Sequence, residues 1–322
     1  MVSMKHLQKL FILFAMGISL CSIQACNDDD DKLDGNNDSP LNHVGEFIPG
    51  STQKLLSVGE YTYHYTLDGK IQSVMYDGGK EIFTYSPNEI QIKSEVDTIE
   101  SEFIMSVTLN DKGYLSETSY SSIGSDENHT WNYIENSTHY YDAEGHLLKM
   151  ITNWTQDGID NNEPYTGSGI DSIVYIWENG LMKQTYYEYK WSWGAEDIYE
   201  KITSHFNYEE GKNKNQSKQD VLFSDYLSYL GFYGKGPDYL PTSRVRTTIS
   251  NEDGEVVTES DTLQYTFEFN EDGTVHQKND TYFTYGTIQE QGNIEKPQAT
   301  TRSEMYQEYN KQFILRAKHR RR

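Results

Sequence analysis

The chain has 322 residues, of which 50 are acidic and 27 basic, giving a formal net charge of −23 at pH 7. This balance argues against nucleic acids and anionic membrane surfaces as partners, because both select patches of Lys and Arg. Hydrophobic residues make up only 35%, and the 26 tyrosines outnumber the 12 phenylalanines and 5 tryptophans combined. Tyrosine suits strands that are half wet, since its ring packs while its hydroxyl reaches water.

The N-terminal segment has the order of a bacterial lipoprotein signal peptide. Two lysines precede the apolar run Leu10–Leu20, and Ala25 stands directly before Cys26. We therefore predict that residues 1–25 are removed and that Cys26 carries acyl chains, palmitate among them. An ordinary secretory signal or a short membrane helix is the alternative, although the run is shorter than the ~20 residues that span a bilayer.

The mature chain keeps Cys26 as its single cysteine and has a formal charge of −25, because removing residues 1–25 takes away two lysines from the −23 total. No disulfide can form if this thiol is acylated. Residues 26–45 begin with the run Asp28–Asp31 and are rich in Asp, Asn, Gly and Ser, which predicts a disordered tether. The chain therefore has to be held together by its core or by sheet hydrogen bonds.

Residues 46–296 are predicted to form one antiparallel β domain, because from about Glu60 to Tyr285 apolar or aromatic residues alternate with polar ones up to a polar residue followed by Gly. Gly accepts the positive φ of a hairpin turn, so the pattern predicts antiparallel hairpins. The fold class expected is all-β, a hairpin meander curling into a barrel-like, porin-like sheet. The predicted turns are Asp68-Gly69, Lys112-Gly113, Glu144-Gly145, Asn179-Gly180, Asp253-Gly254 and Asp272-Gly273.

Other segments depart from this pattern or add to it. Residues 218–232 space their apolar residues as a helix does, which predicts one short helix packed on or plugging the sheet. Residues 297–322 end in His-Arg-Arg-Arg and form either a basic helix or a disordered tail.

Three Asp-Ser/Thr-Ile/Leu triplets, at residues 97–99, 171–173 and 261–263, are each expected to open a strand. They also resemble an O-glycosylation acceptor.

The chain resembles a Bacteroidetes lipoprotein family known as a domain of unknown function with a porin-like fold. The resemblance rests on the lipobox with its acidic run, on the Gly-turn hairpins, and above all on Gly231-Phe232-Tyr233-Gly234-Lys235-Gly236-Pro237-Asp238-Tyr239-Leu240-Pro241. It implies a curved antiparallel sheet, and it supplies no catalytic residues. The acidic run resembles a surface-export signal, which implies an outer-membrane lipoprotein exposed on the cell surface.

No motif for nucleophilic, phosphate or zinc chemistry is present, so the sequence predicts no enzyme, no cofactor and no metal site. His139 and His146 flank one turn, but unligated strand histidines are far commoner than ligands. Residues 157–163 carry oxygen ligands without the spacing of an EF-hand and are expected to form a solvated turn. A hydrolase that uses one of the many carboxylate pairs stays as a third hypothesis.

The densest aromatic stretch is the candidate binding platform. As a strand, it places Tyr187, Tyr189, Trp191 and Trp193 on one face. These rings either pack inside a barrel or lie open to a ligand. The leading hypothesis is a non-enzymatic binding module for a glycan or an outer-membrane partner protein, anchored to the membrane through Cys26. The alternative is a structural envelope protein without a small ligand.

Overall fold

The computed structural model describes residues 52–293, except residues 78, 87–88, 97–100, 126–128, 161–162, 194–195, 224 and 253–254. The chain divides into two compact units, Met1–Asn37 and Asp38–Arg322, and every described residue belongs to the second. The predicted signal peptide, Cys26, the tether and the basic tail lie outside the described residues. Within the described ranges, no helix has the length and apolar character needed to cross a membrane.

The described chain is almost entirely antiparallel β-sheet, which confirms the predicted fold class. Seventeen strands, one α-helix and one 3₁₀ helix follow in chain order: β1 (Lys54–Val58), β2 (Tyr61–Tyr65), β3 (Ile71–Tyr76), β4 (Gly79–Tyr85), β5 (Ile90–Val96), β6 (Ser101–Leu109), β7 (Leu115–Ser125), β8 (His129–Tyr141), β9 (Leu147–Asp160), β10 (Glu163–Glu178), β11 (Leu181–Trp193), β12 (Glu196–Asn207), α2 (Tyr226–Tyr229), β13 (Ser243–Glu252), β14 (Glu255–Gln264), β15 (Phe267–Phe269), β16 (Val275–Lys278), β17 (Thr281–Gly286) and η2 (Ile288–Asn293).

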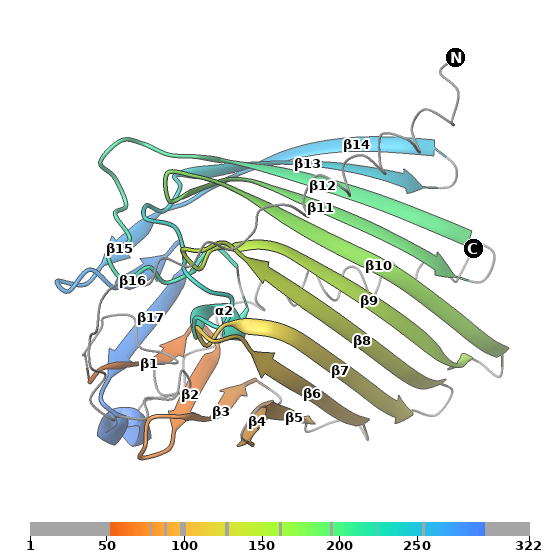
Figure 1. Cartoon of the computed structure of the whole chain (residues 1–322), viewed down its shortest axis with the longest axis horizontal. Helices are drawn as coiled ribbons and strands as arrows, with labels where there is room; N and C mark the ends of the chain where they lie inside the picture. The colour runs from red at the N-terminus through yellow and green to blue at the C-terminus, as the bar shows by residue number, and fades with distance from the viewer. Residues whose placement is uncertain are drawn as a thin grey trace, which may run out of the picture. The chain divides into compact units, whose positions relative to one another are not determined.

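Strands that follow one another in the chain are neighbours in the sheet, and the sheet curls. Antiparallel ladders join each strand to the next from β1 to β14, and Figure 1 shows β6 to β14 side by side in that order. Strand β15 pairs with β16 and β16 with β17. Strand β17 then pairs with β1, where Lys54 lies opposite Gly286. The middle strands are the long ones, with 16 residues in β10 against 5 in β1.

Glycine determines the hairpin turns, as the sequence predicts. The φ angles of the turn glycines are +86° at Gly69, +80° at Gly113, +97° at Gly145, +72° at Gly180 and +81° at Gly273. Residues with a Cβ rarely adopt this region, so each turn depends on its glycine. The Asp253-Gly254 turn lies outside the described residues.

The two triplets that the structure describes do not open strands. Asp171 lies in the middle of β10, and Asp261 lies near the end of β14, while residues 97–99 fall outside the described part of the chain. The prediction is wrong for the two described triplets because the polar stretches before them are already ladder-bonded. Pairing with β9 begins at Glu163, and pairing of β14 with β13 begins at Glu255.

Residues 208–242, here called the plug segment, connect β12 to β13 and pack against one face of the sheet. The predicted helix is present as the single turn α2, where the Asp225 side chain accepts from the Leu227 amide at 2.7 Å and Gly231 at φ +81° follows the end. The rest of the segment is irregular yet apolar. Its buried hydrophobic residues are Val221, Leu222, Leu227, Tyr229, Leu230, Phe232 and Leu240.

Ring contacts join the plug segment to distant strands. Phe223 meets Tyr175 of β10 edge-on at 5.6 Å, and Tyr229 meets Phe283 of β17 in the same way at 5.5 Å. Tyr226 also packs edge-on against a ring of β4. The plug segment therefore completes the core of the curled sheet, and we call the face that it covers the inner face.

The plug segment also binds the glycine turns through its backbone. The Leu115 amide donates to Phe232 O at 2.9 Å, and the Asp238 amide donates to Gly180 O at 2.8 Å. The Lys235 amide donates to Gly145 O at 2.9 Å, close to Gly234, where an added Cβ would lie 2.4 Å from the same oxygen. The Gly-Lys-Gly stretch that carries the family resemblance is thus the part of the chain that docks on these turns.

Candidate ligand-binding face

The predicted platform lies on β11, with its rings on the inner face. Tyr189 stands opposite Asp171 of β10, which shares a face with the core residue Tyr175 four positions on. Tyr189 is only 5% exposed, whereas Tyr187 and Trp191 are half-buried. The side chain of Trp193 lies outside the described residues. On the other face of the strand, Tyr186, Lys190 and Ser192 are exposed.

The three described platform rings touch one another. The ring centroids of Tyr187 and Tyr189 are 6.1 Å apart with planes 16° from parallel, and those of Tyr189 and Trp191 are also 6.1 Å apart. Such offset contacts stabilise aromatic pairs by about 0.5–1.5 kcal/mol beyond their burial. The platform is therefore an ordered array of rings rather than a set of separate side chains.

A second array of ring contacts lies on β6 to β9, strands that the sequence analysis did not single out. Centroid distances are 6.4 Å from Phe103 to Tyr120, 5.9 Å from Tyr120 to Tyr133, and 6.1 Å from Tyr133 to Trp154. Trp154 is 4% exposed and the other three are half-buried. We call these four rings together with Tyr187, Tyr189 and Trp191 the aromatic row.

Glycines inside the strands bring these rings against the sheet. Gly169 of β10 stands opposite Trp154 on one side and Trp191 on the other. A Cβ on Gly169 would lie 2.6 Å from the Trp154 ring, and one on Gly124 would lie 2.2 Å from the Trp131 ring opposite it. Glycine between aromatic residues on neighbouring strands lets the rings lie over its backbone. Glycines away from any predicted turn were the sequence signal for these contacts.

Carboxylates alternate with the rings of the aromatic row. Glu135 lies opposite Tyr120 and Trp154, Asp171 lies opposite Tyr189, and Glu200 lies opposite Tyr189 from the other side. All three are half-buried, and Glu135 accepts from the Tyr133 hydroxyl at 2.5 Å. The inner face of β7 to β12 therefore combines π-faces with negative charge.

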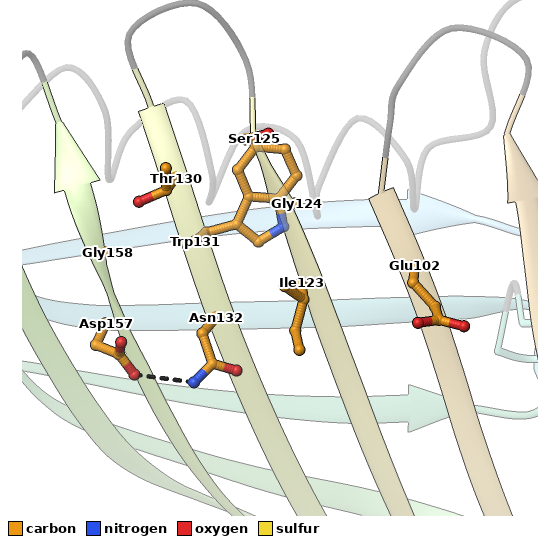
Figure 2. Close-up of a pocket in the computed structure, with 9 residues that line it drawn as sticks. All are labelled: Glu102, Ile123, Gly124, Ser125, Thr130, Trp131, Asn132, Asp157 and Gly158. Carbon is orange, nitrogen blue, oxygen red and sulfur yellow. Dashed lines mark hydrogen bonds between the residues drawn. The ribbon is translucent and has the colours of Figure 1, made fainter.

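The outer face of the same strands carries a shallow recess of about 700 Å³ (Figure 2). Glu102, Ile123, Asn132 and Asp157 lie opposite one another in a row across β6 to β9, and Asn132 Nδ2 donates to Asp157 Oδ1 at 3.1 Å. The two carboxylates are three strand spacings apart, about 14 Å, which exceeds the separation in glycosidase pairs. The recess is open, its lining mixes polar and apolar groups, and Glu102 and Asp157 do not form a catalytic pair of that kind.

The side chains of His139 and His146 pack against aromatic rings and do not form a ligand set. His139 packs against Tyr233 and burial lowers its pKa to about 4, while His146 Nδ1 lies 2.9 Å from Asp142 and its ring stacks on Trp177. Across the described ranges, no three His, Cys, Asp or Glu side chains gather as a metal site. The solvated turn predicted over residues 157–163 is strand at its described positions, because Asp157–Asp160 belong to β9 and Glu163, which pairs with Asp160, begins β10.

No protein-family model matches the chain, and no curated protein is detectably similar to it. Solved structures are similar. A porin-like protein from Bacteroides vulgatus matches with a TM-score of 0.47 and 13% identity, over 72% of this chain and 98% of that one. A porin-like protein from Bacteroides uniformis matches with a TM-score of 0.40 and 16% identity, over 74% and 94%.

Proposed function

We propose that the protein is a lipid-anchored outer-membrane protein, related to the Bacteroidetes family that its sequence resembles, and that it binds a ligand without transforming it. The ligand is a glycan or a segment of a partner protein, and the aromatic row on the inner face of β6 to β11 holds it. The observation that carries the proposal is the partial exposure of those rings. Tyr187, Trp191 and Tyr133 are half-buried although they lie on the core side of the sheet.

Aromatic rings held in place are suited to binding because little side-chain entropy is lost when a ligand covers them. In the aromatic row, Trp154 and Tyr189 are buried and fix the positions of the half-buried rings beside them. A ring whose partner is already ordered offers a preformed apolar surface. This arrangement supports a binding role over a purely structural one.

The exposed polar side chains on the outer face of the sheet favour contact of this face with water, which leaves the predicted lipid as the contact with the membrane. Asn153, Thr155, Ser168, Lys190 and Ser192 point outward and are exposed. A strand in a transmembrane barrel presents apolar residues to lipid and polar residues to the lumen. The middle strands here place rings inside and mostly polar side chains outside, with Ile123, Ile134, Ile159, Ile170 and Tyr186 exposed among them. The predicted lipid on Cys26 and the acidic run after it then supply attachment and surface export.

On the inner face, the arrangement of the carboxylates supports a hydrolase less well than it supports a binding protein. Asp171 and Glu200 are two strand spacings apart, about 10 Å, which is near the separation found in inverting glycosidases. Tyr189 lies in register between them and is 5% exposed. A packed ring therefore fills the place where a sugar and a water molecule would have to stand.

Site-specific photo-crosslinking in cells tests the proposed function and does not require the ligand to be identified first. A photoreactive phenylalanine analogue placed at Tyr187 faces the inner surface, and the same analogue at Tyr186 faces outward. We expect an adduct that changes the mass of the protein at position 187 and none at 186. Absence of any adduct at 187, in a variant that melts normally, argues for the structural alternative.

A further inference from the structure

We propose that residues 313–322, at the C-terminus, form an additional strand that pairs antiparallel with the open edge of β14. The inference goes beyond the proposed function and does not depend on it. The sequence alone favours a basic helix or a disordered tail for residues 297–322, which lie outside the described part of the chain. The open edge of β14, its charge and the direction of the chain after β17 favour an extended strand instead.

Among the described residues, β14 has a ladder partner on one side only. It pairs with β13 along all of its 10 residues. On the other side, the hairpin of β16 and β17 ends at a turn beside Thr266, where the Asn279 amide donates to Thr266 O at 2.9 Å and Asn279 Oδ1 accepts from the Thr266 amide at 2.8 Å. Beyond that turn β14 is the outermost of the long strands (Figure 1).

Hydrogen bonds at the end of β14 show which backbone groups face the open side. The Tyr265 amide donates to Thr242 O, toward β13, at 2.8 Å, whereas Thr266 is bonded to Asn279 on the other side. Backbone groups alternate in direction along an antiparallel strand, so every second residue points its N–H and C=O away from β13. These residues are Val256, Thr258, Ser260, Thr262 and Gln264, and all five are exposed. Such a row is a template for another strand.

The side chains of β14 determine what kind of strand can pair with it. The strand contains no Pro or Lys, and its described register with β13 has no bulge. Its charged residues are Glu255, Glu259 and Asp261, which share the inner face. Two copies of β14 would bring these carboxylates together, and like charges opposite each other destabilise a ladder. The edge therefore disfavours a second copy of itself and favours a strand with basic side chains.

The C-terminal residues have this chemistry. Residues 297–322 contain seven Lys or Arg and two Glu, which gives a net charge of +5. One antiparallel register aligns residues 313–322 with all of β14. Its inner-face pairs are Ile314 with Leu263, Arg316 with Asp261, Lys318 with Glu259, Arg320 with Val257, and Arg322 with Glu255. Each carboxylate then lies opposite a basic side chain, and the half-buried Leu263 lies opposite an apolar one.

The direction and length of the chain allow this pairing. Strand β17 starts at Thr281, beside the turn near Thr266, and runs to Gly286, where η2 follows. A segment that returns from η2 along β17 has to cover about 20 Å to reach the open edge, because β17 has 6 residues. Residues 294–312 can span about 60 Å. The returning segment runs opposite to β17, and it is therefore antiparallel to β14, because β15, β16 and β17 alternate in direction.

Amide hydrogen exchange measured by NMR tests the proposal. It compares the mature chain carrying Cys26→Ala, which has no lipid, with the same chain ending at residue 296. We expect the five outward amides of β14 to exchange at least about tenfold faster in the shortened chain. The amides of Val257, Glu259, Asp261 and Leu263 bond to β13, so they should stay slow in both chains and serve as the internal control.

Charge reversal in the full-length chain tests the register without shortening the protein. Lys318→Glu should speed exchange of the outward amides by about two- to fivefold, and adding Glu259→Lys should slow it again. Lys311→Glu, outside the paired residues, is the matched control and should change nothing. These variants decide the question if the shortened chain loses the slow amides that bond to β13.

Three results would overturn the proposal. Outward amides that exchange equally fast in both chains would mean that the edge stays open. Amides equally slow in both would mean that another part of the protein covers it. Protection that depends on protein concentration would mean that a second molecule supplies the strand. None of these results affects the crosslink expected at Tyr187, so the proposed function is tested separately.

Discussion

At the scale of single residues, the inner face depends on positions where a side chain is missing or where a charge is buried. Gly169 lets Trp154 lie over the backbone of β10, and Asp220 is a carboxylate enclosed by the plug segment. Both positions are informative because the contacts around them allow the change in the free energy of unfolding on substitution to be predicted. They also differ in kind, since the first concerns shape and the second concerns charge.

Gly169→Ala should destabilise the protein by about 1–3 kcal/mol, because the new Cβ would lie 2.6 Å from the Trp154 ring and force it to shift. The matched control is Ser168→Ala, one residue earlier, where the side chain is exposed on the outer face and the cost should stay within about 0.5 kcal/mol. Urea unfolding of both variants measures the difference. Equal midpoints contradict the packing of Trp154 over this glycine.

Asp220 makes stability depend on pH in a defined direction. Burial raises the pKa of Asp220 from 3.8 to about 6. The hydrogen bond that Asp220 accepts from the Leu222 amide at 3.0 Å and the charge of Lys278 both oppose this increase. Between these two pH values the folded chain keeps a proton that the unfolded chain releases, so this group's contribution to stability is greatest below pH 3.8. It falls as the pH rises to 6, above which the full penalty of the buried charge is present.

Asp220→Asn keeps the oxygen that accepts from Leu222 and removes the charge. Above pH 6 the variant should therefore be more stable than the parent by up to about 3 kcal/mol, and the difference should vanish toward pH 4. Thermal melting at several pH values between 4 and 8 measures it. A variant less stable than the parent at pH 7 would show that the interaction with Lys278 outweighs burial.

At the scale of elements, hairpins and plug segment differ in how far the sequence predicts them. Each predicted glycine turn that the structure describes has its glycine at a positive φ, because a polar residue followed by Gly encodes turn geometry locally, whereas the turn at Gly59 between β1 and β2 was not predicted. The contacts of the plug segment were not, since Tyr226, Phe223 and Tyr229 meet strands far away in the sequence. Its helix was overestimated for the same reason: apolar spacing around 218–232 reflects burial on the sheet rather than helical turns.

The candidate site shows the same division. Alternation within β11 places Tyr187, Tyr189 and Trp191 on one face, and the ladder registers agree with that arrangement. The extension of the row to Trp154 and the carboxylates beside it depends on strand register. Register is determined by turn lengths and by cross-strand packing, so reading one strand alone does not reveal it.

Phe232→Ala tests whether the plug segment is part of the core. Its side chain is 1% exposed, and its backbone oxygen accepts from Leu115, a bond that the substitution leaves in place. Loss of the ring should therefore cost about 3–5 kcal/mol through the cavity alone. Lys212→Ala, on an exposed part of the same segment, serves as control and should change stability little. Similar melting temperatures for both variants would mean that the segment is not docked.

At the scale of the whole molecule, the predicted lipid anchor on Cys26 would hold the proposed binding face at the membrane. Cys26→Ala should move the protein from the membrane fraction to the soluble fraction, because the predicted lipid is then its only attachment. Fractionation of cells expressing each form, followed by immunoblotting, measures the shift. An unchanged membrane fraction contradicts the lipid anchor and requires attachment through another part of the chain.

The melting temperature of Trp191→Ala tests most directly whether the aromatic row is a binding face or a filled core. Trp191 is half-buried, so the account predicts a loss of about 1 kcal/mol, which corresponds to a decrease of roughly 2–4 °C for a domain of this size. A tryptophan packed in a filled core would cost about 3–5 kcal/mol and lower the melting temperature by roughly 6–20 °C. A small decrease supports the binding face, and a decrease beyond about 6 °C contradicts it.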